Sequence, residues 1–374
     1  MPCRKDRALG EMCQLCVDAR MVHNSGIGTV LRNVLQRWIP QAPDIFFTLL
    51  GDPAQLGQYA WARADNVRIV SCLAPIYTLR EQWEVRRLVP EGTGLLWVPH
   101  YDIPVFYTGK MLVTVHDVFH LDMQQLVPGL HKRLYAKLMF HAVARKADHI
   151  ICDSHFTAGR LRHFEPQLPE DRVSVIYNGV DSFWQEQPAE TGRLYSRPYI
   201  LFVGNVKPNK NLRKLVEALA LLRDRIEEDL VIVGRREGFI VGDEATVRLA
   251  ESMGSRVHFT GYASDEDLRR YYRDASVLAF PSLYEGFGLP PLEALAAGCR
   301  RLLLNDIPVL HEVFGRAASY VDARDSSALA GGLQACLASE GIPDELALAK
   351  VSEYKWEQTA ARTAALARRT LSGA

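Results

Sequence analysis

The sequence predicts an α/β protein made of two doubly wound domains, each a parallel β-sheet with helices on both faces. Short apolar runs, bounded by turn formers, alternate with helical patterns, as expected of parallel strands that are covered on both sides. This rhythm occurs twice, and a polar segment with two prolines and a glycine, at 181–198, separates the two series. A length of 374 residues also fits two domains better than one.

The first series predicts a domain over 1–185. Its expected strands lie at 13–19, 44–50, 67–72, 95–99, 111–116, 149–154 and 173–179. The second series predicts a domain over 186–350, with strands at 199–204, 229–234, 256–261, 276–282, 300–306 and 318–322. An Ala-rich, helix-prone segment over 351–374 ends the chain. Ligands of such sheets bind at the carboxyl ends of the strands, so the functional residues are expected in the strand-to-helix loops.

Composition excludes several classes of protein. Apolar residues make up 48% and charged residues 24%, which is ordinary for a globular protein. Lysine plus arginine and aspartate plus glutamate both number 44, so no bulk charge predicts a nucleic-acid partner. Seven scattered cysteines favour a reducing compartment, and no apolar run approaches the roughly 18 residues of a membrane span. We therefore expect a cytoplasmic protein.

The first loop of interest is His23-Asn24-Ser25-Gly26-Ile27-Gly28-Thr29, between the first strand and a helix. Glycines let the backbone approach a ligand, and the helix N-terminus offers N–H groups to a phosphate. The third glycine of a dinucleotide fingerprint is missing. Ligand binding and simple tight packing both remain open for this loop.

The second loop follows the strand YILFVG and contains Gly204, Lys207 and Lys210. Two cations beside a helix N-terminus suit a diphosphate whose negative charge grows as it leaves. The alternative is that both lysines only solubilise the loop.

The third loop lies in FPSLYEGFGLPPLEALAAG, at 280–298. Glu285 can accept hydrogen bonds from neutral hydroxyls, and Gly286 and Gly288 expose backbone N–H groups to a phosphate. Glu293 lies within the apolar stretch of the following helix, where an unpaired charge would be costly. This layout suits a sugar attached to a nucleotide.

The run from Tyr199 to Gly298 resembles the donor-binding domain of the retaining GT-B glycosyltransferases of family 4 (group 1), with their E-x7-E pattern at Glu285 and Glu293. Further stretches are similar to the same family and follow in its order: SGIGTVLRNVLQ (25–36), TVHDVFHL (114–121), ADHIICDSHFTAGRL (147–161), VIYNGVDSFW (175–184) and YKWEQTA (354–360). The resemblance implies two Rossmann-like domains facing across a cleft, with the C-terminal helix returning to the N-terminal, acceptor-side domain. SGIG, HDVFHL and the spacing of PNKNL look most like bacterial GDP-mannose-dependent mannosyltransferases of O-antigen or exopolysaccharide synthesis.

The resemblance also implies roles for residues. Glu285 would bind the sugar hydroxyls, Lys210 would neutralise the leaving diphosphate, and His116 would reach the transferred sugar, which makes these three the catalytic candidates. The donor-binding candidates are Gly26, Gly28, Gly204, Asn205, Lys207, Tyr262, Gly286, Phe287, Gly288, Leu289 and Glu293, the last on the nucleotide ribose. Three positions depart from the family: Asn205 and Asn209 stand where basic residues are common, and Thr29 stands where many relatives have arginine.

The expected reaction is transfer of a sugar, mannose from GDP-mannose by preference, to a hydroxyl of a glycan or lipid-linked glycan, with retention and by a front-face route. A UDP- or dTDP-sugar donor, a nucleotide-sugar 2-epimerase and a noncatalytic glycan-binding protein are the alternatives, and an NAD-linked oxidoreductase ranks behind them. No metal or other cofactor is expected. Asp265 and Asp267 fit the acidic first turn of a helix capped by Ser264, and His116 and His120 follow a strand pattern instead of lying on a zinc-binding helix.

The helix-forming stretch 130–147 carries five basic residues among apolar ones. It could lie against an anionic inner membrane that presents a lipid-linked acceptor, or it could pack on the sheet as an ordinary amphipathic helix.

Overall fold

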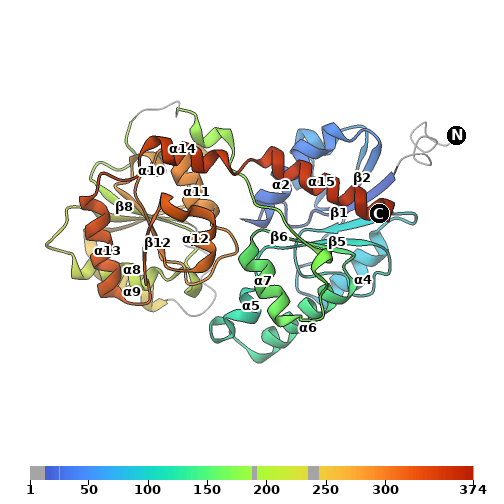
Figure 1. Cartoon of the computed structure of the whole chain (residues 1–374), viewed down its shortest axis with the longest axis horizontal. Helices are drawn as coiled ribbons and strands as arrows, with labels where there is room; N and C mark the ends of the chain where they lie inside the picture. The colour runs from blue at the N-terminus through green and yellow to red at the C-terminus, as the bar shows by residue number, and fades with distance from the viewer. Residues whose placement is uncertain (1–12, 25, 188–191, 235–243, 374) are drawn as a thin grey trace. The chain divides into compact units, whose positions relative to one another are not determined.

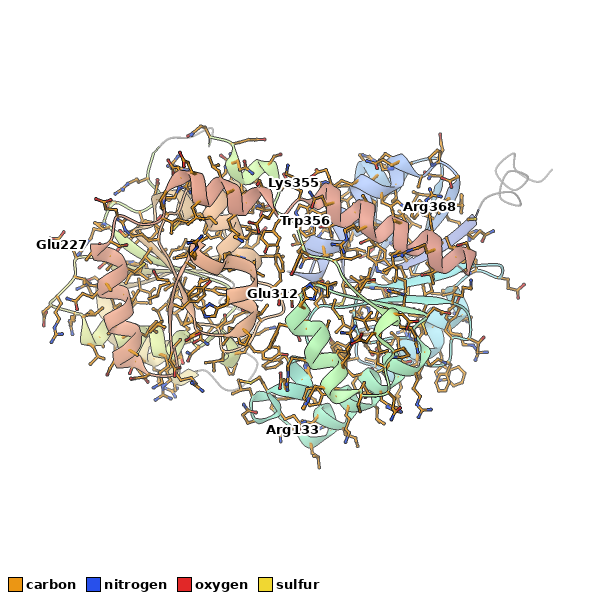
Figure 2. All side chains as sticks on the ribbon, viewed as in Figure 1. Arg133, Glu227, Glu312, Lys355, Trp356 and Arg368 are labelled. Atoms are coloured by element: carbon orange, nitrogen blue, oxygen red, sulfur yellow. The ribbon has the colours of Figure 1, made fainter. Side chains whose placement is uncertain are left out.

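The computed structural model describes residues 13–24, 26–187, 192–234 and 244–373. They form two compact units, one within Met1–Gly179 together with Trp356–Ala374 and the other within Val180–Lys355. The chain thus passes between units after Gly179 and again after Lys355, which Figure 2 labels beside Trp356.

The first unit contains a seven-stranded parallel sheet with the order β3-β2-β1-β4-β5-β6-β7. Its strands are β1 (Cys13–Asp18), β2 (Ile45–Gly51), β3 (Val67–Ser71), β4 (Leu95–Val98), β5 (Met111–Val115), β6 (His149–Cys152) and β7 (Val173–Val175). The described helices around it are α2 (Ile27–Trp38), α3 (Pro53–Leu56), α4 (Leu79–Leu88), α5 (Phe119–Asp122), α6 (Leu130–Lys146), α7 (His155–Phe164) and α15 (Trp356–Ser372). Trp38 of α2 packs on the sheet against Phe47 and Trp97, with ring centroids 5.4 and 5.9 Å apart.

The second unit contains a six-stranded parallel sheet with the order β10-β9-β8-β11-β12-β13. Its strands are β8 (Tyr199–Val203), β9 (Asp229–Val233), β10 (Val257–Gly261), β11 (Val277–Phe280), β12 (Leu302–Asn305) and β13 (Ser319–Val321). The described helices are α8 (Leu212–Leu221), α9 (Glu244–Ser252), α10 (Asp265–Asp274), α11 (Leu289–Ala296), α12 (Pro308–Phe314), α13 (Ser326–Ala338) and α14 (Asp344–Ser352). All pairings in both sheets are parallel, so the predicted α/β class with two doubly wound sheets is confirmed.

The C-terminal helix α15 belongs to the first unit and packs against α2 (Figure 1). Arg37 of α2 donates to Glu357 at 2.7 Å, and Arg368, labelled in Figure 2, donates to Asp44 at 2.5 Å. The hydroxyl of Thr359 donates to the carbonyl of Tyr177 at 2.7 Å. The expectation that this helix returns to the N-terminal domain is therefore confirmed.

The first residues of the polar segment 181–198 pack on the second unit. Asp181 caps a short 3-10 helix, Ser182–Gln185, by accepting from the N–H of Phe183 at 3.0 Å. Trp184 of this turn is buried and lies edge-on to Tyr272, with centroids 5.6 Å apart. The start of the segment expected to be a linker is thus a packed entry to the second sheet.

Candidate functional site

The order of the second sheet reverses between β8 and β11, which lie side by side. Crevices outside the carboxyl ends of strands at such a reversal are the usual ligand sites of doubly wound sheets. The loops that follow β8 and β11 contain Lys210 and Glu285, so two of the three catalytic candidates lie at this position.

Lys210 and Glu285 form an ion pair. The Nζ of Lys210 lies 2.5 Å from Oε1 of Glu285, and the side chains are 20% and 15% exposed. The same Nζ lies 5.3 Å from the centre of the Phe280 ring, at the end of β11. Both charged groups are therefore confined, and each neutralises the other.

Amide contacts join the loop that contains Lys210 to the loops that follow β11 and β13. Asn211, in the left-handed region with φ 56°, donates from Nδ2 to the carbonyls of Pro281 and Ala323 at 3.2 and 2.7 Å. The N–H of Leu283 donates to the carbonyl of Asn209 at 2.7 Å. Asn209 is thus a backbone anchor between the loops.

The helix α11 begins directly after the Glu285 loop. Gly288 caps it with φ 109°, and a Cβ there would lie 3.1 Å from Leu310 and 3.2 Å from Phe314. Pro290 and Pro291 have no N–H, so the amides of Gly288 and Leu289 supply the donors at this helix start. The positive φ favours glycine at 288, and the tight packing against Leu310 and Phe314 adds to that preference.

Glu293 is half-buried on α11 and accepts a hydrogen bond from the hydroxyl of Tyr272 at 3.1 Å. Burial raises the pKa of Glu293 to about 7, and the Tyr272 hydrogen bond opposes that rise. The sequence argument that a charge in this apolar stretch needs a partner is correct, and Tyr272 is that partner. A ligand hydroxyl would add a second donor to a carboxylate that is otherwise poorly solvated.

The other donor-side candidates differ in exposure. Asn205 and Lys207 are exposed, and Tyr262 is 72% exposed. Phe287 is buried and packs edge-on against Tyr354 at 5.4 Å, so its side chain belongs to the core and only its backbone can serve a ligand. Gly286 is buried in the same loop.

Gly204 directly follows β8 and has φ 145°. Its neighbour in space is Gly234, which directly follows β9 and which sequence reasoning missed. A Cβ on Gly234 would lie only 2.2 Å from the carbonyl oxygen of Gly204. The shared Val-Gly ending of β8 and β9 is the signal that could have identified this close approach.

In the first unit, the two glycines of the β1–α2 loop have different roles. A Cβ on Gly28 would lie 2.6 Å from the carbonyl oxygen of Val22, so Gly28 is required by packing. Gly26 has φ 74°, and nothing lies within 4 Å of its Cβ position. Ser25, which is part of the predicted motif, lies outside the described residues.

His116 follows β5 and is held between two acceptors. Its Nδ1 lies 2.7 Å from Oδ2 of Asp153, and its Nε2 lies 2.9 Å from the carbonyl oxygen of Pro99. Burial alone would lower the pKa of His116, but Asp153 and the Pro99 carbonyl outweigh burial and raise it. Because both ring nitrogens face acceptors, the geometry favours the doubly protonated imidazolium.

Sequence reasoning missed a buried charge network at the carboxyl ends of β1 and β4. Arg20 bridges Asp18 at 2.6 Å and Glu81 at 2.9 Å, and Nε2 of His100 lies 3.3 Å from the Asp18 carboxylate. Burial, together with Asp102, raises the pKa of Glu81 to about 8. Asp18 at the end of an apolar run, followed two residues later by an arginine, is the signal that could have found it.

Two of the sequence interpretations concerned possible metal ligands. His116 directly follows β5 and His120 lies in α5, so the two histidines do not share a helix, as expected. Ser264 Oγ accepts from the N–H of Asp267 at 3.1 Å at the start of α10, which confirms the helix-cap interpretation of Asp265 and Asp267. Across the described residues, no cluster of three or more His, Cys, Asp or Glu side chains is arranged to hold a metal ion. The expectation of a metal-independent protein stays a prediction.

Comparisons with known proteins match both units. The model of the glycosyl transferases group 1 matches residues 185–353, and that of glycosyltransferase family 4 matches residues 25–182. The O-antigen chain mannosyltransferase B of Escherichia coli is 29% identical over 70% of this chain and 72% of its own length. RfbU of Salmonella typhimurium, an O-antigen chain mannosyltransferase, is 26% identical over 78% of this chain and 77% of its own length. The serotype-specific mannosyltransferase WbdA of E. coli is 29% identical over 70% of this chain, but the match spans only 33% of WbdA.

Solved structures agree on the fold. The Anabaena protein HepE in complex with UDP and glucose has a TM-score of 0.74 at 16% identity, over 97% of this chain and 100% of that one. Sucrose-phosphate synthase from Thermosynechococcus elongatus has a TM-score of 0.73 at 19% identity, with the same coverage. At these identities the likeness supports the fold alone. With the two family models matching successive parts of the chain, and with this fold, the chain belongs to the GT-B glycosyltransferases of the group 1 and family 4 type.

Proposed function

We propose that this glycosyltransferase moves a mannosyl group from GDP-mannose to a hydroxyl of a glycan or lipid-linked glycan, with retention at the anomeric carbon and without a metal ion. It would act in the cytoplasm, with the acceptor as its second partner. The observation that carries the chemistry is the Lys210–Glu285 pair, formed between the loops that follow β8 and β11.

The pair supplies both functions that a nucleotide-sugar donor needs. A diphosphate brings negative charge that competes with Glu285 for the Lys210 ammonium, and sugar hydroxyls can then donate to the released carboxylate. The amides of Gly288 and Leu289 add positive character at the helix start. This positive charge is the basis for proposing metal independence.

In the reaction, the bond between the anomeric carbon and the diphosphate oxygen breaks, and a bond from that carbon to the acceptor oxygen forms on the same face. The acceptor proton passes to the departing phosphate oxygen, so charge and atoms balance without a protein nucleophile. Lys210 stabilises the diphosphate as its charge grows. Glu293 would accept from the nucleotide ribose, and roles for Gly26, Gly28 and His116 stay predictions.

The preference for mannose rests on the names of the relatives. Two of them, each matched over more than 70% of its length, are O-antigen chain mannosyltransferases. The sugar and the nucleotide base are therefore the first quantities to test.

Thermal unfolding with GDP, UDP, dTDP, ADP and their sugars, in EDTA and in magnesium, tests the donor. A ligand at about 100 times its Kd adds about 2.7 kcal/mol, which is about 5–10 °C for a unit of this size. We expect GDP and GDP-mannose to give this shift in EDTA. A shift with UDP or dTDP species alone would overturn the donor, and a shift that needs magnesium would overturn metal independence.

A second measurement distinguishes the activity from its alternatives. Product analysis with GDP-mannose should show GDP release that depends on a glycan acceptor. Conversion of the sugar in the absence of an acceptor would instead indicate a 2-epimerase. A protein that neither changes nor is stabilised by any of the nucleotide sugars would be a noncatalytic glycan-binding protein.

A further inference from the structure

Large apolar side chains are exposed on one part of the first unit. The exposed large apolar residues described in this unit lie within or near α4 and α6 in the sequence: Leu73, Tyr77, Leu79, Trp83, Phe106, Leu130, Leu134 and Leu138. The exposed large apolar residues of the second unit, Leu194, Leu221, Tyr262 and Leu348, are scattered along its sequence. Single exposed leucines are ordinary, and only apolar residues that lie together indicate an interaction surface.

The helix α6 has two apolar faces. Ala136, Phe140 and Val143 are buried and face the interior. Leu130, Leu134 and Leu138 follow at intervals of four residues on the opposite side and are 79%, 56% and 57% exposed. The helix therefore packs on the unit with one face, as the second sequence interpretation of 130–147 expects, and presents an apolar stripe with the other.

The same helix is strongly basic. Its 17 residues include Lys132, Arg133, Lys137, Arg145 and Lys146 and no Asp or Glu. Lys132, Lys137 and Arg145 are exposed, whereas Arg133, labelled in Figure 2, donates to the carbonyl of Val127 at 2.9 Å and anchors the start of the helix. The outer stripe of leucines therefore lies among cations.

An aromatic pair extends this surface. Trp83 of α4 and Phe106 are stacked with ring centroids 4.7 Å apart and are 60% and 44% exposed. Hydrogen bonds of the preceding residue, Val105, connect this segment to both helices: Lys146 of α6 donates to the carbonyl of Val105 at 2.7 Å, and the N–H of Val105 donates to Gln82 of α4 at 2.8 Å. Both helices lie in the first unit in Figure 1.

We propose that the outer face of α6, together with the Trp83–Phe106 pair, docks on the surface of an anionic lipid bilayer. Leucine and tryptophan side chains would enter the interface, and the lysines and Arg145 would lie at the level of the headgroups. A second copy of this face is the poorer partner, because two helices with five cations and no acidic residue would repel each other. The inference rests on the proposed function only in that a lipid-linked acceptor gives the docking a purpose.

The described helices do not include one that is long and apolar enough to cross a membrane. The proposed contact is therefore peripheral, and its strength depends on a few side chains that can be changed without disturbing the core.

Flotation of the full chain with vesicles tests the proposal. The vesicles consist of phosphatidylcholine alone or of phosphatidylcholine mixed with phosphatidylglycerol, at low and high salt. The variant Leu134→Gln/Leu138→Gln removes the apolar stripe, and Leu221→Gln/Leu348→Gln is the matched control with two equally exposed leucines of the second unit. Lys137→Gln/Arg145→Gln removes charge.

We expect binding to the anionic vesicles that salt weakens, a loss of about tenfold or more in the stripe variant, and no change in the control. Binding that is equal in the stripe variant and the wild type, or no binding of the wild type, would overturn the proposal. A wild type that is dimeric by light scattering, with a monomeric stripe variant, would assign the face to a second copy instead. The thermal shift with nucleotide sugars should be the same in all these variants, so a failure of docking is distinguishable from a failure of the proposed donor.

Discussion

The substitution Lys210→Ala tests whether the ion pair of the second unit is catalytic. In the structure the ammonium lies 2.5 Å from the Glu285 carboxylate and is 20% exposed, so a diphosphate that displaced Glu285 would meet a confined, poorly hydrated cation. Loss of one such contact to a developing oxyanion costs about 2.7–4 kcal/mol. We therefore expect kcat to fall by about 100-fold to 1,000-fold, with a much smaller change in the binding of the nucleotide sugar.

The assay is the rate of nucleotide release from the nucleotide sugar that stabilises the protein, with and without a glycan acceptor. Lys214→Ala is the matched control, because Lys214 of α8 also pairs with a glutamate, Glu217 at 2.7 Å, and is not one of the candidate residues. Removal of Lys210 also leaves the partly buried Glu285 without its partner, so the thermal unfolding of both variants must be compared with that of the wild type. A rate close to wild type in Lys210→Ala, or an equal loss in Lys214→Ala, would refute the reasoning.

Three further predictions concern the packing and protonation of the candidate residues. Gly28→Ala should lower the free energy of unfolding by about 1–3 kcal/mol, because its Cβ would lie 2.6 Å from a backbone oxygen, whereas Gly159→Ala in α7 meets nothing within 4 Å and should not destabilise; equal denaturation midpoints for both would contradict this. The pKa of Glu293 is raised from 4.5 to about 7, so the free energy of unfolding of the wild type should fall by about 2–3 kcal/mol more than that of Glu293→Gln between pH 5 and pH 8. Denaturation curves at the two pH values measure this difference, and parallel pH profiles of the two proteins would argue against it. The raised pKa of His116 contributes stability that is present below pH 6.5 and is lost as pH rises through the pKa of the folded state. Because Asp153 is a main cause of the raised pKa, Asp153→Asn should lower the pKa of His116 in an NMR titration, and an unchanged pKa would disprove the pairing.

The strands were predictable because a parallel strand that is covered on both faces appears in sequence as a continuous apolar run. Each of the thirteen predicted runs coincides with a strand of the structure, and only β2 extends beyond its run, by the single residue Gly51. Glu293 could be recognised as unusual for the same reason, since it interrupts an apolar stretch, although its partner Tyr272 lies 21 residues away on another helix. What the sequence marks in such cases is the need for a partner, and only the fold supplies the partner's identity.

The buried network around Arg20 shows where sequence reasoning stops. Arg20 and Glu81 are 61 residues apart, and they meet because β1 and α4 end up at the same edge of the sheet. No local spacing encodes that contact. The outer stripe of α6 is a different case, because its leucines at intervals of four are visible in the sequence, but which of two apolar faces is buried depends on how the helix packs.

The β1–α2 loop shows how the structure can divide a motif that the sequence presents as one. Both glycines fit a ligand loop, and both fit tight packing. Gly28 has a complete packing explanation, since any side chain would meet the carbonyl of Val22. Gly26 has open space around its Cβ position and a positive φ of 74°, so backbone conformation accounts for glycine there and packing does not. If this loop contacts a diphosphate, the contact should therefore depend on Gly26, and a variant at Gly28 should lose stability before it loses affinity.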